Sequence, residues 1–87
     1  MKLNYQFEIT DVAGDLIAVP VGDGAEKLHG VLTLNETAAD LLRLLASDTD
    51  EDALVSAMRE KYEGDEKEIR AFIHGYLDEL RGMGLLA

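Results

Sequence analysis

The 87-residue sequence has no cysteine, no tryptophan and a single proline. The lack of cysteine excludes disulfides, thiol nucleophiles and thiolate metal ligands. Aromatic residues make up only 6% of the chain, so we expect an aliphatic core. No apolar run approaches the roughly 18 residues of a membrane span, and the first residues do not resemble a signal core. These absences predict a soluble chain that binds no membrane, with the cytoplasm as its default location.

Basic residues are scarce as well. Eight Lys and Arg stand against 18 Asp and Glu, which gives a formal net charge of −10. Such a field repels phosphate backbones, so we expect no nucleic-acid partner. The simplest interpretation of most carboxylates is that they keep a small protein in solution. The length predicts one domain, residues 1–87, with one modest core.

The hydrophobic period changes at Asn35. Residues 30–34 alternate as a strand does, whereas Ala38, Leu41, Leu42 and Leu45 recur at helical spacing. Asn is a favoured N-cap because its side-chain oxygen accepts a backbone N–H of the first turn. We therefore predict a strand over about residues 28–34 that leads directly into a helix.

Two earlier strands are predicted over residues 5–9 and 16–21, joined by a turn at residues 13–15. Pro20 cannot donate a hydrogen bond, so it belongs at a strand end, a bulge or an edge. A glycine-rich loop, residues 22–27, leads to the third strand. The first half of the chain thus predicts a hairpin plus one strand.

Two further helices follow. Thr49 and Asp52 have the spacing of a capping box, as do Asp65 and Glu68. The apolar face of the second helix would be Leu54, Val55, Met58 and Tyr62. The apolar arc of the third, which runs to about residue 81, would be Ile69, Phe72, Ile73, Tyr76 and Leu80, with Leu77 at its border. Residues 83–87 should fold back on the core. The predicted class is α+β, a three-stranded antiparallel sheet followed by three helices.

Residues for catalysis or metal binding are few. Neither His29 nor His74 has a His or Cys partner three or four residues away. The acidic residues 48–52 lack the spacing of a calcium loop, and no phosphate-binding loop is present. We predict no catalytic residue, no metal and no cofactor, and hence no enzyme activity of the chain itself.

The third helix offers a binding surface instead. Lys67, Arg70, His74 and Arg81 fall within roughly 60° of one another on a helical projection. This basic stripe either pairs with acids of its own helix or contacts a ligand. Gly75 costs the helix about 1 kcal/mol relative to alanine. Either another element of the domain or a ligand would then approach it closely.

The sheet provides the other half of a site. Three strands cannot close into a barrel, so an edge strand keeps unpaired N–H and C=O groups that an extended peptide can bind. An edge strand beside a helix would form a groove.

Several short motifs carry a family resemblance: Leu-Asn-Glu-Thr-Ala-Ala-Asp-Leu-Leu at residues 34–42, Ala-Leu at 53–54, Lys-Tyr at 61–62, Phe-Ile-His-Gly-Tyr-Leu-Asp-Glu-Leu at 72–80 and Gly-Leu-Leu at 84–86. With them the sequence resembles the PqqD family, named for a small protein of pyrroloquinoline quinone (PQQ) biosynthesis, from about residue 5 to residue 87. The resemblance implies a winged-helix-like fold.

The resemblance also implies a function. Family members bind the leader of a ribosomally made precursor peptide as an added strand between the third strand and the third helix. They present it to a modifying enzyme, often a radical S-adenosylmethionine enzyme. The implied peptide-binding residues are Leu28, His29, Gly30, Val31, Leu32, Thr33, Lys67, Arg70, Ala71, His74, Gly75, Leu77 and Arg81. We expect a monomer or a weak homodimer.

Other functions remain open. A general protein-interaction or regulatory module fits the same elements, including one that dimerises through its edge strands. A winged-helix DNA binder would need a broad basic surface, which an acidic chain does not provide. An acyl carrier protein would need an Asp-Ser-Leu motif, and neither Ser47 nor Ser56 lies in one.

Overall fold

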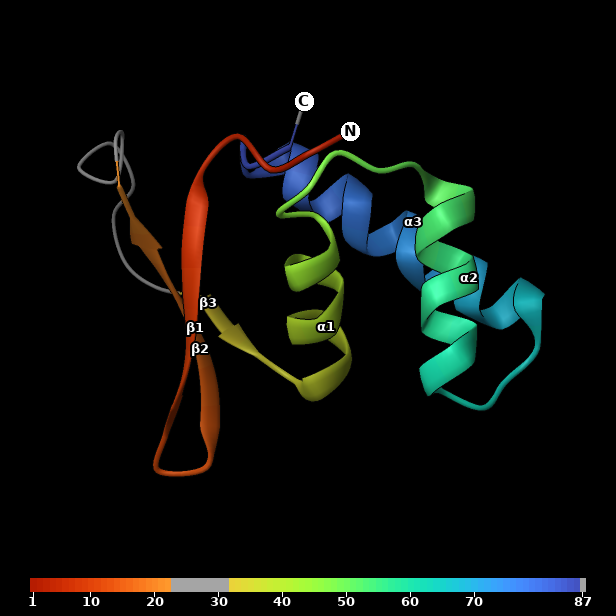
Figure 1. Ribbon diagram of the computed structural model, residues 1–87, viewed down its shortest axis with the longest axis horizontal. Helices are drawn as coiled ribbons and strands as arrows, with labels where there is room; N and C mark the ends of the chain where they lie inside the picture. The colour runs from red at the N-terminus through yellow and green to blue at the C-terminus, as the bar shows by residue number, and fades with distance from the viewer. Residues whose placement is uncertain (23–31, 87) are drawn as a thin grey trace.

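The computed structural model describes residues 1–22 and 32–86 (Figure 1). Its elements, in chain order, are β1 (Gln6–Val12), β2 (Asp15–Val21), β3 (Leu32–Leu34), α1 (Glu36–Leu44), α2 (Glu51–Lys61) and α3 (Glu66–Gly82). In Figure 1 the strands lie on one side, α1 stands beside them, and α2 and α3 lie beyond α1. The predicted class, an antiparallel three-stranded sheet followed by three helices, is confirmed.

A tight hairpin joins β1 and β2. Val12 lies opposite Asp15, which leaves Ala13 and Gly14 as a two-residue loop. Both loop residues have positive φ, 54° and 89°, as hairpin turns of the primed type require. The Gly14 N–H donates to Asp11 Oδ1 at 3.0 Å. The hairpin prediction is confirmed, although both strands extend further toward the turn than predicted.

The strands follow the order β1-β2-β3, with β2 in the centre. Leu16 and Ala18 of β2 lie opposite Leu34 and Leu32 of β3. Pro20 lies opposite Phe7, one residue before β2 ends, which agrees with one of its predicted positions. The rest of the predicted third strand, residues 28–31, and loop residues 23–27 lie outside the described residues.

One face of the sheet packs on the helices. Ala18 and Leu34 are buried there, with partly buried side chains such as Phe7, Ile9 and Leu16 around them. The helices supply the rest of the core: Ala38, Ala39, Leu41, Leu42, Leu45, Leu54, Val55, Met58, Ile73, Leu77 and Leu80. Within the described residues, none of the helices has both the length and the apolar character needed to cross a membrane.

The C-terminal tail folds back on this core, as predicted. Leu85 and Leu86 are 4% and 3% exposed, and Leu86 forms a bridge with Leu3. The Asn4 N–H donates to the Leu85 carbonyl oxygen at 2.8 Å. The two ends of the chain therefore lie close together, as Figure 1 also shows.

Two of the three predicted helix caps are confirmed. Asn35 Oδ1 accepts from the Ala38 N–H at 2.8 Å, and Asp65 Oδ1 accepts from the Glu68 N–H at 2.8 Å. The third prediction was wrong, because Asp50 rather than Thr49 caps α2. The Thr49 N–H donates to the Met1 carbonyl oxygen, which holds Thr49 against the N-terminal residue. The carboxylate of Asp50, one residue later, then accepts the hydrogen bond from the Ala53 N–H in the first turn of α2.

The buried face of α3 differs from the predicted arc. It centres on Ile73, Leu77 and Leu80, each no more than 1% exposed. Phe72 was predicted to lie in the core but is 38% exposed, and Leu77, predicted at the border, is fully buried. The face of α3 that packs on the core is therefore rotated about the helix axis, by part of a turn, from the predicted arc. The reason is that α2 packs beside α3 on the Leu77 side.

Candidate functional site

The first candidate surface is the outer edge of β3. Within the described residues this strand pairs with β2 only, so its other edge keeps unpaired main-chain groups. Thr33 is exposed, Leu32 is partly buried and Leu34 is buried. Of the predicted strand residues, Leu28, His29, Gly30 and Val31 lie outside the described residues. The described part of the edge is three residues long and runs directly into α1.

Two residues of the basic stripe on α3, Arg70 and His74, contact acidic side chains at the start of α2. Arg70 Nη1 lies 2.9 Å from Asp52 Oδ1, and Arg70 Nη2 lies 3.4 Å from Glu66 Oε1. Hydrogen bonds to these two carboxylates raise the pKa of Arg70. His74 Nδ1 lies 3.0 Å from Glu51 Oε1. The intrahelical pairing expected for Arg70 is therefore present, together with bridges to α2 that the sequence did not predict.

Arg81 and His74 border a small pocket at the other end of this interface. Its volume is about 360 Å³, and it is lined by Met1, Thr49, Asp50, Glu51, His74, Leu77 and Arg81. Arg81 Nη1 lies 3.4 Å from Asp78 Oδ1, the second intrahelical pair that was expected. Three of the predicted site residues are thus brought together, but beside residues 49–51 and the N-terminal residue. The contribution of Met1 had no signal in the sequence.

Lys67, Ala71 and Gly75 of the predicted helix surface are exposed, as are His74 and Arg81. A Cβ atom added at Gly75 would meet nothing within 4 Å in the described structure. Close packing of another described element therefore does not explain this glycine. Because Gly75 has no side chain, the surface of α3 at this point is open.

The opposite flank of α3 carries two aromatic side chains, Phe72, which is exposed, and Tyr76, which is partly buried. The rings of Phe72 and Tyr76 are stacked, with centroids 6.1 Å apart and an interplanar angle of 17°. Burial, and to a smaller degree the charge of Glu79, raises the pKa of Tyr76, which is partly buried. Phe72 lies about 100° from Ile73 on the helix, away from the Arg70 flank that α2 covers. We call Ile69, Phe72 and Tyr76 the aromatic flank. The hydrophobic pattern had predicted these three residues to lie in the core.

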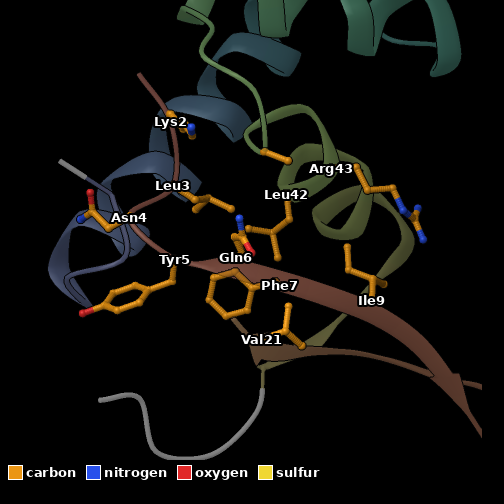
Figure 2. A pocket seen from close by; sticks show the side chains of 11 residues that line it. Lys2, Leu3, Asn4, Tyr5, Gln6, Phe7, Ile9, Val21, Leu42 and Arg43 are labelled. Carbon is orange, nitrogen blue, oxygen red and sulfur yellow. The ribbon is translucent and has the colours of Figure 1, made fainter. Parts of the chain in front are cut away.

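A larger groove lies at the other edge of the sheet. Its volume is about 730 Å³, and Figure 2 shows Phe7 and Ile9 of β1 on one side with Leu42 and Arg43 of α1 on the other. The N-terminal residues 2–5 close one end. The sequence does not indicate this groove, because the groove depends on how far α1 lies from β1.

Asp40 is the one buried charged residue in the described part of the chain, at 8% exposure. It accepts a hydrogen bond from the Tyr62 hydroxyl, and it lies 2.9 Å from Lys61 Nζ and 3.2 Å from Arg43 Nη1. Its partners satisfy both oxygens, so the cluster joins α1 to the end of α2. Within residues 1–22 and 32–86, no group of three or more His, Cys, Asp and Glu side chains is arranged to hold a metal ion.

Comparison with protein families provides the identity. The family model described as coenzyme PQQ synthesis protein D (PqqD) matches residues 23–86. The chain belongs to the PqqD family. The match includes β3 and all three helices but excludes β1 and β2. The family is associated with PQQ synthesis, where it is an accessory rather than a catalytic component. Comparison with curated proteins and with solved structures found no match.

Proposed function

We propose that this PqqD-family chain binds the leader segment of a ribosomally made precursor peptide and presents it to a modifying enzyme. The observation that carries the proposal is the position of β3 within the family match. It is an edge strand, its outer side is unpaired among the described residues, and it is connected directly to α1. An extended peptide can continue such a sheet through main-chain hydrogen bonds.

The leader would add to β3 as a fourth strand, with its side chains reaching α3. The proposed strand residues remain those of the predicted segment, of which Leu32 and Thr33 are described. Main-chain hydrogen bonds give strand addition its affinity, while side-chain contacts select the sequence. The helix therefore decides which leader is bound.

On α3 we favour the aromatic flank for apolar leader residues. Arg70 and His74 are already engaged by the carboxylates of Asp52 and Glu51, so a leader would have to compete for them. Phe72 is 38% exposed and has only Tyr76 stacked on it. Burying the exposed part of such a ring contributes on the order of 1 kcal/mol. Lys67, at the start of the helix, would contact acidic leader residues.

The chain would supply recognition and not chemistry. The covalent modification would belong to the partner, of which a radical S-adenosylmethionine enzyme is the type that the family resemblance implies. An adaptor of this kind holds the leader in place so that the core of the precursor reaches the enzyme. This proposal explains why a small accessory chain belongs to a biosynthetic family.

An amide NMR titration tests the proposal. The probe is a synthetic peptide with the leader sequence of the precursor encoded beside the gene. We expect shifts in residues 32–34 and in α3, and Phe72→Ser should weaken binding about fivefold or more while the helices remain folded. Arg59→Gln, at an exposed position of α2, is the control. Unchanged spectra at about 1 mM leader would reject the proposal.

A second comparison separates the two flanks of α3. If Arg70→Gln weakens leader binding more than Phe72→Ser does, the basic stripe is the contact surface. If only Phe72→Ser weakens leader binding, the aromatic flank is the contact surface. Thermal melting of both variants must accompany the titration, because Arg70 also joins α3 to α2.

A further inference from the structure

The groove between β1 and α1 has a composition that differs from the rest of the molecule. Its lining comprises Lys2, Leu3, Asn4, Tyr5, Gln6, Phe7, Ile9, Val21, Leu42, Arg43 and Ala46. Among the described lining residues two are basic and none is acidic, in a chain with 18 acidic residues and a net charge of −10. The remaining lining is apolar or neutral. The groove therefore favours a ligand with both apolar and negatively charged groups.

Arg43 stands at the side of this groove that α1 forms. Its Nη1 lies 3.2 Å from Asp40 Oδ1, yet the side chain is 54% exposed. Asp40 also has Lys61 Nζ at 2.9 Å, so two cations share this one buried carboxylate. Glu36 also acts on Lys61, so the cation that this end of the groove offers to a ligand is the exposed guanidinium of Arg43. Lys2, exposed at the other end, adds a second cation.

The groove runs along an unpaired strand edge. Among the described residues β1 pairs only with β2, so alternate N–H and C=O groups of its outer edge face away from the sheet. Tyr5, Phe7 and Ile9 alternate along this segment and are all partly buried. Phe7 and Ile9 lie opposite Leu42 across the groove (Figure 2). A strand added at β1 would cover these apolar side chains beneath α1.

We propose that this groove, which we call the β1 groove, binds an extended segment of a partner protein in which two apolar residues, with a carboxylate on either side of them, share one face of the strand. The segment adds a strand to β1, places its two apolar side chains over Phe7 and Ile9, and directs the carboxylates of the same face toward Lys2 and Arg43. The site lies on the opposite edge of the sheet from β3. It does not depend on the leader proposal, and both edges can be occupied at once.

A pair of designed peptides tests this inference. The probe is a blocked heptapeptide of sequence Glu-Thr-Val-Thr-Ile-Thr-Glu, in which Glu, Val and Ile share one face of the strand, and its counterpart carries Lys in place of each Glu. On electrostatic grounds alone an acidic chain should prefer the lysine peptide. We expect the acidic peptide to shift amides of residues 2–9 and 42–46, and the lysine peptide to leave them unchanged. Shifts confined to β3 and α3, stronger binding of the lysine peptide in the groove, or no shift at about 1 mM would each overturn the proposal.

Variants that replace basic residues by glutamine test whether the acidic peptide contacts Lys2 and Arg43. Lys2→Gln with Arg43→Gln should weaken binding of the acidic peptide about three- to tenfold, since it removes two exposed ion-pair partners. Arg59→Gln with Lys67→Gln changes the net charge equally but lies outside the groove lining. Equal weakening by both double variants would overturn the proposal. Ala46→Trp at an exposed position of the lining fills the groove, and retained binding in that variant would overturn it as well.

The two sites are distinguished by their variants. A leader peptide that still binds the Ala46→Trp variant, while the acidic heptapeptide does not, is the expected result for separate edges. Loss of leader binding in Ala46→Trp would place both peptides in the β1 groove and overturn the claim that they occupy opposite edges.

Discussion

The Tyr62 hydroxyl donates a hydrogen bond to the Asp40 carboxylate, which ties the end of α2 to the middle of α1. Lys61 and Arg43 bind the same carboxylate. Ionised groups are rarely buried without such partners, because desolvation of an unpaired charge costs several kcal/mol. The cluster therefore sets the position of α2 relative to α1, and thereby the surface that α2 offers to α3.

The pH dependence of stability should report on Asp40. Burial raises its pKa and is the largest single influence, but hydrogen bonds from Tyr62 and Lys61, with the charges of Lys61 and Arg43, together lower the pKa below its ordinary value. A lowered pKa in the folded state means that ionised Asp40 stabilises the fold at neutral pH. That contribution is lost as the pH falls through the folded-state pKa.

The wild type should accordingly lose more stability than Asp40→Asn between about pH 5 and about pH 2, as measured by urea denaturation. Asp15→Asn, at an exposed position of the hairpin, is the control. Parallel pH curves for the wild type and Asp40→Asn would contradict the role given to this carboxylate.

Asn35→Ala should lower the free energy of unfolding by about 1 kcal/mol. The substitution removes the acceptor of the Ala38 N–H at the point where β3 becomes α1. Asn35→Ser should retain most of the stability, since serine also caps helices well. If the Asn35→Ala and Asn35→Ser variants are equally stable in chemical denaturation, the cap contributes little to the stability of the β3–α1 junction.

Gly75→Ala should raise the free energy of unfolding by about 0.5–1 kcal/mol. The added methyl group meets nothing within 4 Å, and Gly75 lies in the interior of α3. Gly84→Ala is the contrasting variant, because Gly84 has a φ of +76° and alanine there is strained. Thermal melting of both variants distinguishes a helix effect from a general effect of glycine. A destabilised Gly75→Ala would mean that the surface at this point is not open.

Leu86→Ala should cost about 2–4 kcal/mol, because Leu86 is 3% exposed and bridges Leu3 near the N-terminus. Met83→Ala, in the same tail but 50% exposed, should change stability by less than about 0.5 kcal/mol. Urea denaturation of the two variants gives the comparison. Similar losses at both positions would show that the tail packs differently.

The features that were predictable from the sequence are local in the chain. Asn35 and Asp65 were correctly identified as caps because each bonds an N–H three residues further on. The period change at Asn35 revealed the junction of β3 and α1 for the same reason. The family model covers β3 and the three helices, in which most of the motifs that resemble the PqqD family lie.

The remaining features were decided by contacts between residues far apart in the sequence. Thr49 does not cap α2 because its N–H is bonded to Met1, and no local pattern encodes that contact. Phe72 is exposed because α2 packs on the Arg70 flank of α3, where the Asp52 carboxylate accepts a hydrogen bond from the Arg70 guanidinium. The β1 groove exists because the side of the core between β1 and α1 is left open.

By itself, then, the sequence determined the order of strands and helices, two of the three caps and the family, because these depend on short-range hydrogen bonding and on hydrophobic period. Only the tertiary structure decided which flank of α3 faces α2, that Asp40 binds Tyr62, and where the grooves lie. Those outcomes depend on the packing of whole elements, in which a rotation of α3 by part of a turn exchanges buried and exposed side chains without changing any local pattern.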